Sequence, residues 1–306
     1  MRRFASVNAW IVGTPGRQAI VDTGMPGEET AELWRQAEAS GGVGGVAAVV
    51  CTHMHRDHTG QAPALLRRHR AALHMSAREH ERLLRAAAAP PEQSRDTLRR
   101  FLFATGMAED AANRVAPIDY AMLSPFPADF RPLEEGAELT LGGMAWQVLL
   151  GGGHSAQGAC LLAMDGSAMI TGDQILPGAG PHIAVWAGEP EADPLAEYFR
   201  FLDRLAGLPD ELLVLPGHGA PFRGVAGQAA ALRQAHARRL ERLRAAFGAR
   251  AMSCVEMAPL VFSDRARARF GELAPGMTLA LANHLWHRGE LRRRVDVDGV
   301  YRFSLS

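Results

Sequence analysis

Short apolar runs and amphipathic stretches alternate along the first 75 residues. Runs bounded by glycine, proline or polar residues predict strands at 7–12, 19–22, 43–50 and 73–75. Apolar positions spaced by three and four predict helices at 28–39 and 60–70. The resulting order (strand, strand, helix, strand, helix, strand) is typical of a layered α/β domain.

The pattern changes between residues 76 and 131. Helical spacing at 79–89 and 94–105 is separated by Pro90-Pro91 and followed by an irregular, proline-spaced tail. We interpret this segment as a helical insertion. Either it decorates the outside of the core, or it forms a cap that shapes a substrate pocket, as long inserted segments often do. The sequence leaves both interpretations open.

Strand patterns return after residue 131. The glycines of Gly142-Gly143 and Asp165-Gly166 predict two tight hairpins. The predicted strands lie at 137–141, 144–150, 159–164, 167–170 and 212–215, with a helix at 197–205. We therefore expect residues 1–224 to form one catalytic domain that carries the insertion.

The segment from Val225 to Ser306 has a different organisation. A long amphipathic helix is predicted at 225–247 and shorter helices between 252 and 287. A hairpin that turns at Asp298-Gly299 follows at 291–303. Helices followed by such a hairpin resemble a winged helix, so we expect a small helical module at 225–306.

The composition is that of an ordinary globular protein. Of its 306 residues, 47% are hydrophobic and 22% charged, which suits a sizeable core. No run approaches the roughly 18 apolar residues that a membrane span needs. Polar residues soon interrupt the segment after Met1-Arg2-Arg3, so we expect no signal peptide. The scattered cysteines Cys51, Cys160 and Cys254 predict free thiols and a cytoplasmic location.

Charge is balanced overall but divided unevenly. Residues 225–306 contain 14 arginines against 7 acidic residues, and the rest of the chain is acidic by the same margin. With Arg292-Arg293-Arg294, this excess of arginine motivates nucleic-acid binding as one interpretation of the module. The chain contains no lysine, so arginine carries all of the positive charge that lysine and arginine usually share. An excess of arginine is therefore weak evidence for nucleic-acid binding. We therefore favour a cap over the active site or a dimer contact.

Four ligand-type residues follow the predicted strand at 43–50. They are His53, His55, Asp57 and His58 in the stretch Cys51-Thr52-His53-Met54-His55-Arg56-Asp57-His58-Thr59-Gly60. Imidazole and carboxylate groups are the usual nitrogen and oxygen ligands of zinc and its neighbours. This spacing on one loop predicts a metal site.

Three further residues occupy the same kind of position. His154, Asp173 and His218 each follow an apolar strand on a loop with glycine. Because strand ends of one sheet converge on one edge, all seven residues are expected to meet. Asp22 also ends a strand; either it forms a turn or cap, or it orients a ligand histidine.

These residues resemble the metallo-β-lactamase fold superfamily. Its signature is His-x-His-x-Asp-His, then Gly-His-Ser/Thr, Gly-Asp and Gly-His, and Asp22 matches the acidic residue of its Val-Asp-Thr-Gly strand. The resemblance implies an α/β fold, a four-layer αββα sandwich with two metal ions at its edge. By position it implies one metal on His53, His55 and His154, a second on Asp57, His58 and His218, and Asp173 bridging them.

Two departures from the family pattern matter. Gly153 lies in a Gly-Gly-His sequence where many relatives have Pro-Gly-His. True zinc β-lactamases generally lack the histidine equivalent to His58 and have cysteine in place of Asp173. We therefore do not expect antibiotic hydrolysis to be the main activity.

The implied chemistry is metal-dependent hydrolysis. Two divalent cations (zinc foremost, with iron or manganese as alternatives) would lower the pKa of a bridging water and supply hydroxide. Asp57 would orient this hydroxide and pass a proton to the leaving atom.

We expect a small acyl substrate, a thioester or ester, as in enzymes that resemble glyoxalase II. A lactonase and a metal-dependent ribonuclease that holds RNA with the C-terminal module are the alternatives. The side chains of Trp186, Phe126 and Met122 either line an acyl pocket or belong to the core. His182 lies on the loop after Asp173 and is given no role.

Overall fold

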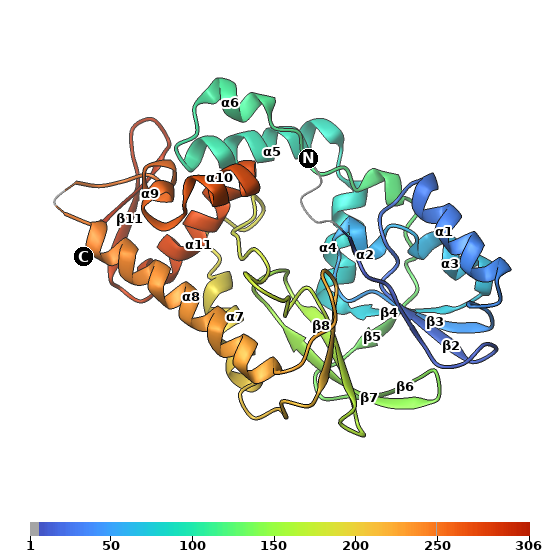
Figure 1. Cartoon of the computed structure of the whole chain (residues 1–306). Coiled ribbons are helices and arrows are strands. Elements are labelled where there is room, and N and C mark those ends of the chain that lie inside the picture. Colours follow the sequence, from blue (N-terminus) through green and yellow to red (C-terminus); the bar gives the residue numbers. More distant parts are fainter. Residues whose placement is uncertain (1–5, 249) are drawn as a thin grey trace.

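The structure is a computed structural model that describes residues 6–248 and 250–306, so that Met1-Arg2-Arg3 lies outside the described residues. Two five-stranded sheets form its centre (Figure 1). In the first sheet β2 to β5 are parallel and β1 is antiparallel to β2. Its strands, in spatial order, are β1 (Trp10–Val12), β2 (Gln18–Val21), β3 (Val46–Val50), β4 (Ala72–Ser76) and β5 (Arg131–Leu133).

The second sheet is mostly antiparallel. Only its edge pair, β9 and β10, is parallel. Its strands, in spatial order, are β10 (Leu213–Pro216), β9 (Ala168–Gly172), β8 (Gly158–Ala163), β7 (Met144–Gly151) and β6 (Glu138–Leu141).

Strand register brings the loops with ligand-type residues to one edge of the two sheets. In the first sheet Val21 pairs with Val50, and in the second Gly172 pairs with Pro216. Each pair is parallel, so the loops that leave the two strands start side by side. Backbone pairing of the strands therefore places the loops that carry these residues next to one another.

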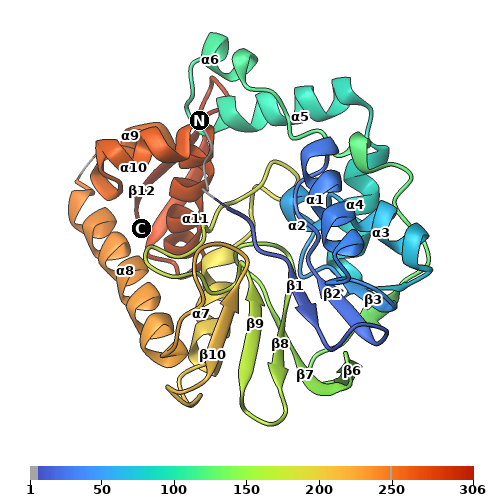
Figure 2. The same cartoon turned by 45° about the vertical axis from the view of Figure 1, so that its right-hand side comes forward.

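Buried apolar side chains form three layers. The middle layer lies between the sheets and includes Val50, Trp146 and Ile170. A second layer covers the outer face of the first sheet, and a third covers the outer face of the second sheet. The helices over the first sheet are α1 (Glu28–Ala39), α2 (Arg56–Thr59) and α3 (Ala62–His69), and α7 (Pro194–Arg204) lies on the second. The predicted αββα sandwich is confirmed (Figure 2).

The insertion is helical, as predicted. It contains α4 (Ala77–Ala88), α5 (Pro91–Ala104), α6 (Glu109–Arg114) and the 3-10 turn η1 (Ala121–Leu123). Pro91 is the first residue of α5, where a missing N–H costs nothing. Helices α5 and α6 extend from the layer of α1 to α4 toward the C-terminal helices (Figures 1 and 2). The backbone N–H of Val255 donates to the carbonyl of Thr105 at 3.2 Å, which joins the two parts.

The C-terminal module consists of helices and one hairpin, as predicted. Its elements are α8 (Val225–Ala246), α9 (Cys254–Val261), α10 (Asp264–Phe270), η2 (Gly271–Leu273), α11 (Ala274–His287), β11 (Leu291–Val295) and β12 (Tyr301–Leu305). Ser253 and Glu256 form a reciprocal capping box at the start of α9. Helix α11 is buried from Ala274 to Leu285 and is the centre of the module.

Some elements differ from the sequence predictions. Strand β5 was missed because it has three residues and contains Pro132, which is tolerated only at a sheet edge. Helix α6 was missed because six residues are too few for a clear periodic pattern. Strand β3 begins at Val46, three residues later than predicted, because Gly45 adopts a φ of 64°. The domain boundary between residues 224 and 225 stays a prediction.

Among the described residues, no helix combines the length and the apolar character that a membrane span requires.

Gly60 tests how tightly the ligand loop is packed. A Cβ added there would lie 2.1 Å from the backbone N of Pro26 and 2.4 Å from the backbone C of Met25. Because backbone atoms cannot move aside like a side-chain tip, we expect Gly60→Ala to lower the free energy of unfolding by about 1–3 kcal/mol. Urea denaturation measures this. Gly44→Ala is the matched control, since a Cβ at Gly44 meets nothing within 4 Å, and an equal loss in both variants would contradict the packing argument.

Candidate metal centre

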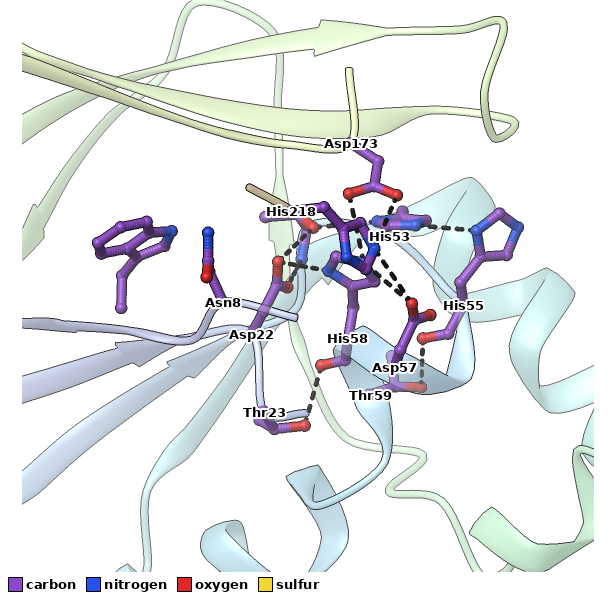
Figure 3. A network of polar contacts seen from close by, with 12 residues as sticks. Asn8, Asp22, Thr23, His53, His55, Asp57, His58, Thr59, Asp173 and His218 are labelled. Atoms are coloured by element: carbon purple, nitrogen blue, oxygen red, sulfur yellow. Dashed lines mark hydrogen bonds and ion pairs between the residues drawn. The ribbon is translucent and has the colours of Figure 1, made fainter. Parts of the chain in front are cut away.

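The structure brings all seven predicted ligand residues together. Figure 3 shows six of them: His53, His55, Asp57, His58, Asp173 and His218. The seven residues come from the four segments that follow β3, β7, β9 and β10. Asp57 and His58, which the sequence analysis placed on a loop, lie on the short helix α2. Within the described residues, three groups have ligand atoms that lie within 4.8 Å of one another. These groups are His53, His55 and His154; His53, His58 and Asp173; and Asp57, His58 and His218.

The first group consists of three imidazoles. Nδ1 of His55 lies 3.0 Å from Nε2 of His53 and 3.0 Å from Nε2 of His154. All three side chains are buried or nearly so. Three ring nitrogens therefore point at one small volume.

The group of Asp57, His58 and His218, called the second group from here on, lies on the other side of Asp173 from the first group. Nε2 of His218 is 3.2 Å from Oδ2 of Asp57, and Nε2 of His58 is 3.8 Å from the same oxygen. Asp173 places Oδ1 3.4 Å from Nε2 of His58 and Oδ2 3.4 Å from Nε2 of His154. Its two oxygens thus face both groups, and the bridging role itself stays a prediction.

Asp22 orients His58. Its Oδ2 accepts hydrogen bonds from Nδ1 of His58 at 2.7 Å and from Oγ1 of Thr52 at 2.8 Å. Its Oδ1 accepts from the backbone N–H of Thr52 at 2.8 Å. Asp22 has a φ of 60°, an unusual conformation for a residue other than glycine, which aims the carboxylate into the site. Of the two roles left open by the sequence, the structure supports the orienting one.

Other ligand histidines have comparable partners. Nδ1 of His154 donates to the backbone carbonyl of His182 at 3.0 Å, and Nδ1 of His218 donates to that of Ser6 at 2.6 Å. Nδ1 of His53 lies 3.1 Å from Oγ1 of Thr52. In the neutral form of each ring we assign the proton to Nδ1 from these acceptors, so that the lone pair of Nε2 is directed toward the centre.

These residues fit a pair of bound cations. Nε2 of His58 and Oδ1 of Asp173 are buried and make no hydrogen bond within the described part of the chain. In the first group, His55 has one Nδ1 proton at most and cannot satisfy both neighbouring Nε2 lone pairs. Divalent cations would satisfy these converging lone pairs, and nitrogen with carboxylate oxygen is a suitable donor set.

The pKa shifts follow from burial and crowding. Burial, with repulsion from His154, lowers the pKa of His55 to about 3. Burial alone would lower the pKa of His218, but hydrogen bonds to Asp173 and Asp57 outweigh it and raise this pKa to about 10. Neutral imidazole is the form that binds metal, so the first group is ready to bind, whereas the second must release protons.

Glu79 was missed by the sequence analysis. This fully buried residue of α4 accepts a hydrogen bond at Oε2 from the backbone N–H of Met54 (2.9 Å) and at Oε1 from that of Gln157 (2.6 Å). Met54 lies between His53 and His55, and Gln157 is on the loop of His154. One carboxylate therefore joins the two loops that supply the first group. Periodicity places Glu79 in a helix but does not reveal this contact.

Of the two glycines before His154, Gly153 is required by its backbone conformation and close packing, whereas Gly152 faces a side-chain tip that can move. Gly153 has a φ of 115°, and a Cβ on it would lie 2.6 Å from Cβ of Tyr198. A Cβ on Gly152 would lie 2.1 Å from Oε2 of Glu197. Glu197 thus lies close to Gly152, the position where many relatives have proline, and the ligand His154 is retained.

A cavity of about 530 Å³ lies beside the centre. Its lining includes Gly153 and Ser155 next to His154, and the indole of Trp186, whose ring centroid is 5.8 Å from that of His55. The cavity lining is Arg78, Arg82, Gly153, Ser155, Ala156, residues 184–186, residues 189–194 and Glu197.

Two of the three predicted pocket residues do not line this cavity. Phe126 is buried in the core layer over the first sheet, which is the alternative that the sequence left open. Met122 is half-exposed, and its sulfur lies 3.2 Å from Arg56. His182, which was given no role, lies close to the centre, with its ring centroid 4.6 Å from that of His154.

Known families match both parts of the chain. The family model described as the metallo-beta-lactamase superfamily matches residues 2–218. A second model, the metallo-beta-lactamase-like C-terminal domain, matches residues 240–306.

Two solved structures are similar over nearly the whole chain. A beta-lactamase domain protein from Burkholderia ambifaria has 32% identity and a TM-score of 0.83, covering 98% of this chain and 88% of that one. A metallo-beta-lactamase family protein from Thermus thermophilus has 25% identity and a TM-score of 0.79, covering 98% and 94%.

Curated relatives match only in part. An atrochrysone carboxyl ACP thioesterase from Aspergillus novofumigatus is 47% identical over 60 residues, which cover 20% of this chain and 18% of the relative. A thioesterase of the same description from Cryptosporiopsis is 23% identical over 182 residues, or 58% and 42%. The matches thus span less than half of either relative.

Glu79→Gln tests the link between the two ligand loops. An amide has one oxygen, so one backbone N–H would face an NH₂ group instead of an acceptor. We expect the affinity of the first group for zinc to fall by about 10–100-fold, the usual effect of losing an outer partner of metal ligands. Competition with a zinc chelator measures this.

Glu81→Gln is the matched control for Glu79→Gln. Glu81 is on the same helix, but it is exposed and pairs with Arg85. Equal zinc affinity in both variants would contradict the role given to Glu79.

Proposed function

The chain belongs to the metallo-beta-lactamase superfamily, a superfamily of hydrolytic enzymes, and on this premise we propose that it hydrolyses an acyl thioester with two divalent metal ions. The observation that carries the proposal is the position of Asp173, whose oxygens face two separate groups of ligand atoms. Two cations held by these groups would suit displacement at a carbonyl carbon better than a single structural ion would.

The cations would supply a nucleophile by lowering the pKa of a water molecule and would polarise the carbonyl oxygen of the substrate. Asp57 has a side chain that is 27% exposed, against 5% for Asp173, so water and substrate can reach it. Asp57 would orient the attacking water and carry its proton to the departing sulfur. Asp22 and Glu79 keep the ligand side chains in place during turnover.

Cysteine does not act as the nucleophile in this scheme. Cys51, Cys160 and Cys254 are fully buried free thiols. Burial raises the pKa of Cys254 to about 12 and also raises that of Cys51, so their thiolates are scarce at neutral pH. Buried free thiols also agree with a reducing, cytoplasmic environment.

The nitrogen and oxygen donors of the two ligand groups suit zinc.

The cavity beside His154 would receive the acyl group. Its wall near the centre includes Val185, Trp186 and Pro190, which offer apolar surface. The names of the two curated relatives favour a thioester over other acyl compounds. A lactone, a small cyclic ester, would be attacked at the same kind of carbonyl carbon but would release an alkoxide instead of a thiolate, so a lactone is the second candidate.

A ribonuclease is less well supported. Of the three consecutive arginines, Arg293 packs against the rings of Trp286 and Tyr301 and donates to the carbonyl of Pro190 at 3.0 Å. This guanidinium therefore has an internal role.

A substrate panel tests the function. We expect the zinc-loaded protein to cleave butyryl and hexanoyl thioesters of N-acetylcysteamine, detected by release of free thiol. The panel also contains a γ-lactone, a cephalosporin and single-stranded RNA. Cleavage of the lactone or RNA without thioester cleavage would overturn the proposal.

Asp173→Ala tests the bridging role. We expect bound zinc to fall below two ions per chain and turnover to fall by more than roughly 100-fold, beyond what losing an outer partner causes. Elemental analysis and the thiol assay measure both. Asp203→Ala, which removes a half-exposed carboxylate paired with Arg233 on the surface, is the control. Two zinc ions per chain in Asp173→Ala would contradict the bridging role.

A further inference from the structure

One side of the cavity is formed by residues 189–193, here called the wall segment. It has no regular secondary structure of its own and precedes α7. Three consecutive carbonyls in it, those of Pro190, Glu191 and Ala192, accept hydrogen bonds from side chains of the C-terminal module. Side chains of the C-terminal module therefore hold the backbone of the wall segment in position.

Asn283 makes the central contact. This residue of α11 is fully buried, and its Nδ2 donates to the carbonyl of Pro190 at 3.1 Å and to that of Ala192 at 2.9 Å. A side-chain amide has two N–H groups, one for each carbonyl. Loss of the amide would remove a donor from two partly buried carbonyls, which favours movement of the segment.

Arg293 keeps Asn283 in its working orientation. It donates to Oδ1 of Asn283 at 3.3 Å and to the carbonyl of Pro190 at 3.0 Å. Its guanidinium carbon lies 3.9 Å from the ring centroid of Tyr301 and 5.0 Å from that of Trp286. Because Arg293 can only donate, Asn283 must turn its oxygen to Arg293 and its NH₂ to the wall segment.

The ends of the wall segment are also held. Nδ1 of His284 lies 3.1 Å from Oδ2 of Asp193, which caps α7 through the backbone N–H of Ala196. At the other end, Glu189 pairs with Arg82 of the insertion at 3.0 Å. The Glu189 pair is partly exposed and adds less than the buried contacts.

We propose that the C-terminal module determines which acyl groups the active site accepts, because Asn283 and Arg293 fix the wall segment. The inference rests on the proposed function, in which this cavity receives the acyl group. Asn283 and Arg293 are positioning residues, since they act through the wall segment and reach neither the ligand atoms nor the cavity.

The test compares Arg293→Met with Arg292→Met. Methionine keeps much of the apolar stem at position 293 but donates no hydrogen bond, whereas Arg292 is exposed and serves as the control. KM and kcat are measured for acetyl and hexanoyl thioesters of N-acetylcysteamine, together with zinc content. Asn283→Asp, which replaces the NH₂ donor by an acceptor, is a second variant at the same contact.

We expect Arg293→Met to raise KM for the hexanoyl thioester about fivefold or more, with a change of less than about twofold for the acetyl thioester. Zinc content should stay at the wild-type level, because a defect in general folding would lower it. An unchanged ratio of the two KM values in both Arg293→Met and Asn283→Asp would overturn the inference.

Binding of octanoate, measured by calorimetry, separates this inference from the proposed function. If the wild-type protein cleaves no thioester, the proposed function fails. The positioning role still predicts weaker octanoate binding in Arg293→Met than in Arg292→Met. Equal octanoate binding in the wild type and both variants would overturn the positioning role itself.

Discussion

The centre depends on one constraint: each ligand imidazole must turn a defined nitrogen toward the same small volume. For four histidines the protein meets this constraint by giving Nδ1 a fixed partner. These partners are Asp22 for His58, Thr52 for His53, and the carbonyls of His182 and Ser6 for His154 and His218. Without them the rings could rotate or change tautomer, and the lone pairs would no longer converge.

Two of these partners, Asp22 and Thr52, lie just after the ends of strands β2 and β3. Parallel register places the loops after β2 and β3 side by side, and the loops after β9 and β10 likewise. Asp22 therefore reaches His58 without a long connection. Glu79 adds a link from α4, so the insertion contributes to the centre as well as to the cavity. Helix α4 is thus linked by hydrogen bonds to the loops that carry the ligand residues.

Much of this site could be predicted from the sequence, because strand ends and local spacing are encoded locally. His53, His55, Asp57 and His58 lie in one short stretch, and His154, Asp173 and His218 share the same position after a strand. Contacts between distant segments were not predictable. Glu79 and Asn283 act on backbone groups 78 and 93 residues away, and no periodic pattern records such pairs. Phe126 was ambiguous for the same reason, since its apolar character fits a core as well as a pocket.

The insertion and the C-terminal module meet around the cavity. Arg82 comes from one and Asn283 from the other, and both contact the wall segment. In the proposed positioning role, the buried helix α11 supports the cavity through Asn283. The catalytic ligands can then stay fixed while the surrounding segments set the shape of the cavity.

Anomalous diffraction at the zinc absorption edge, from crystals of the zinc-loaded protein, would test the central claim most directly. The account predicts two peaks, one beside His53, His55 and His154 and one beside Asp57, His58 and His218, with Asp173 between them. A single peak, or peaks away from Asp173, would contradict a two-metal centre.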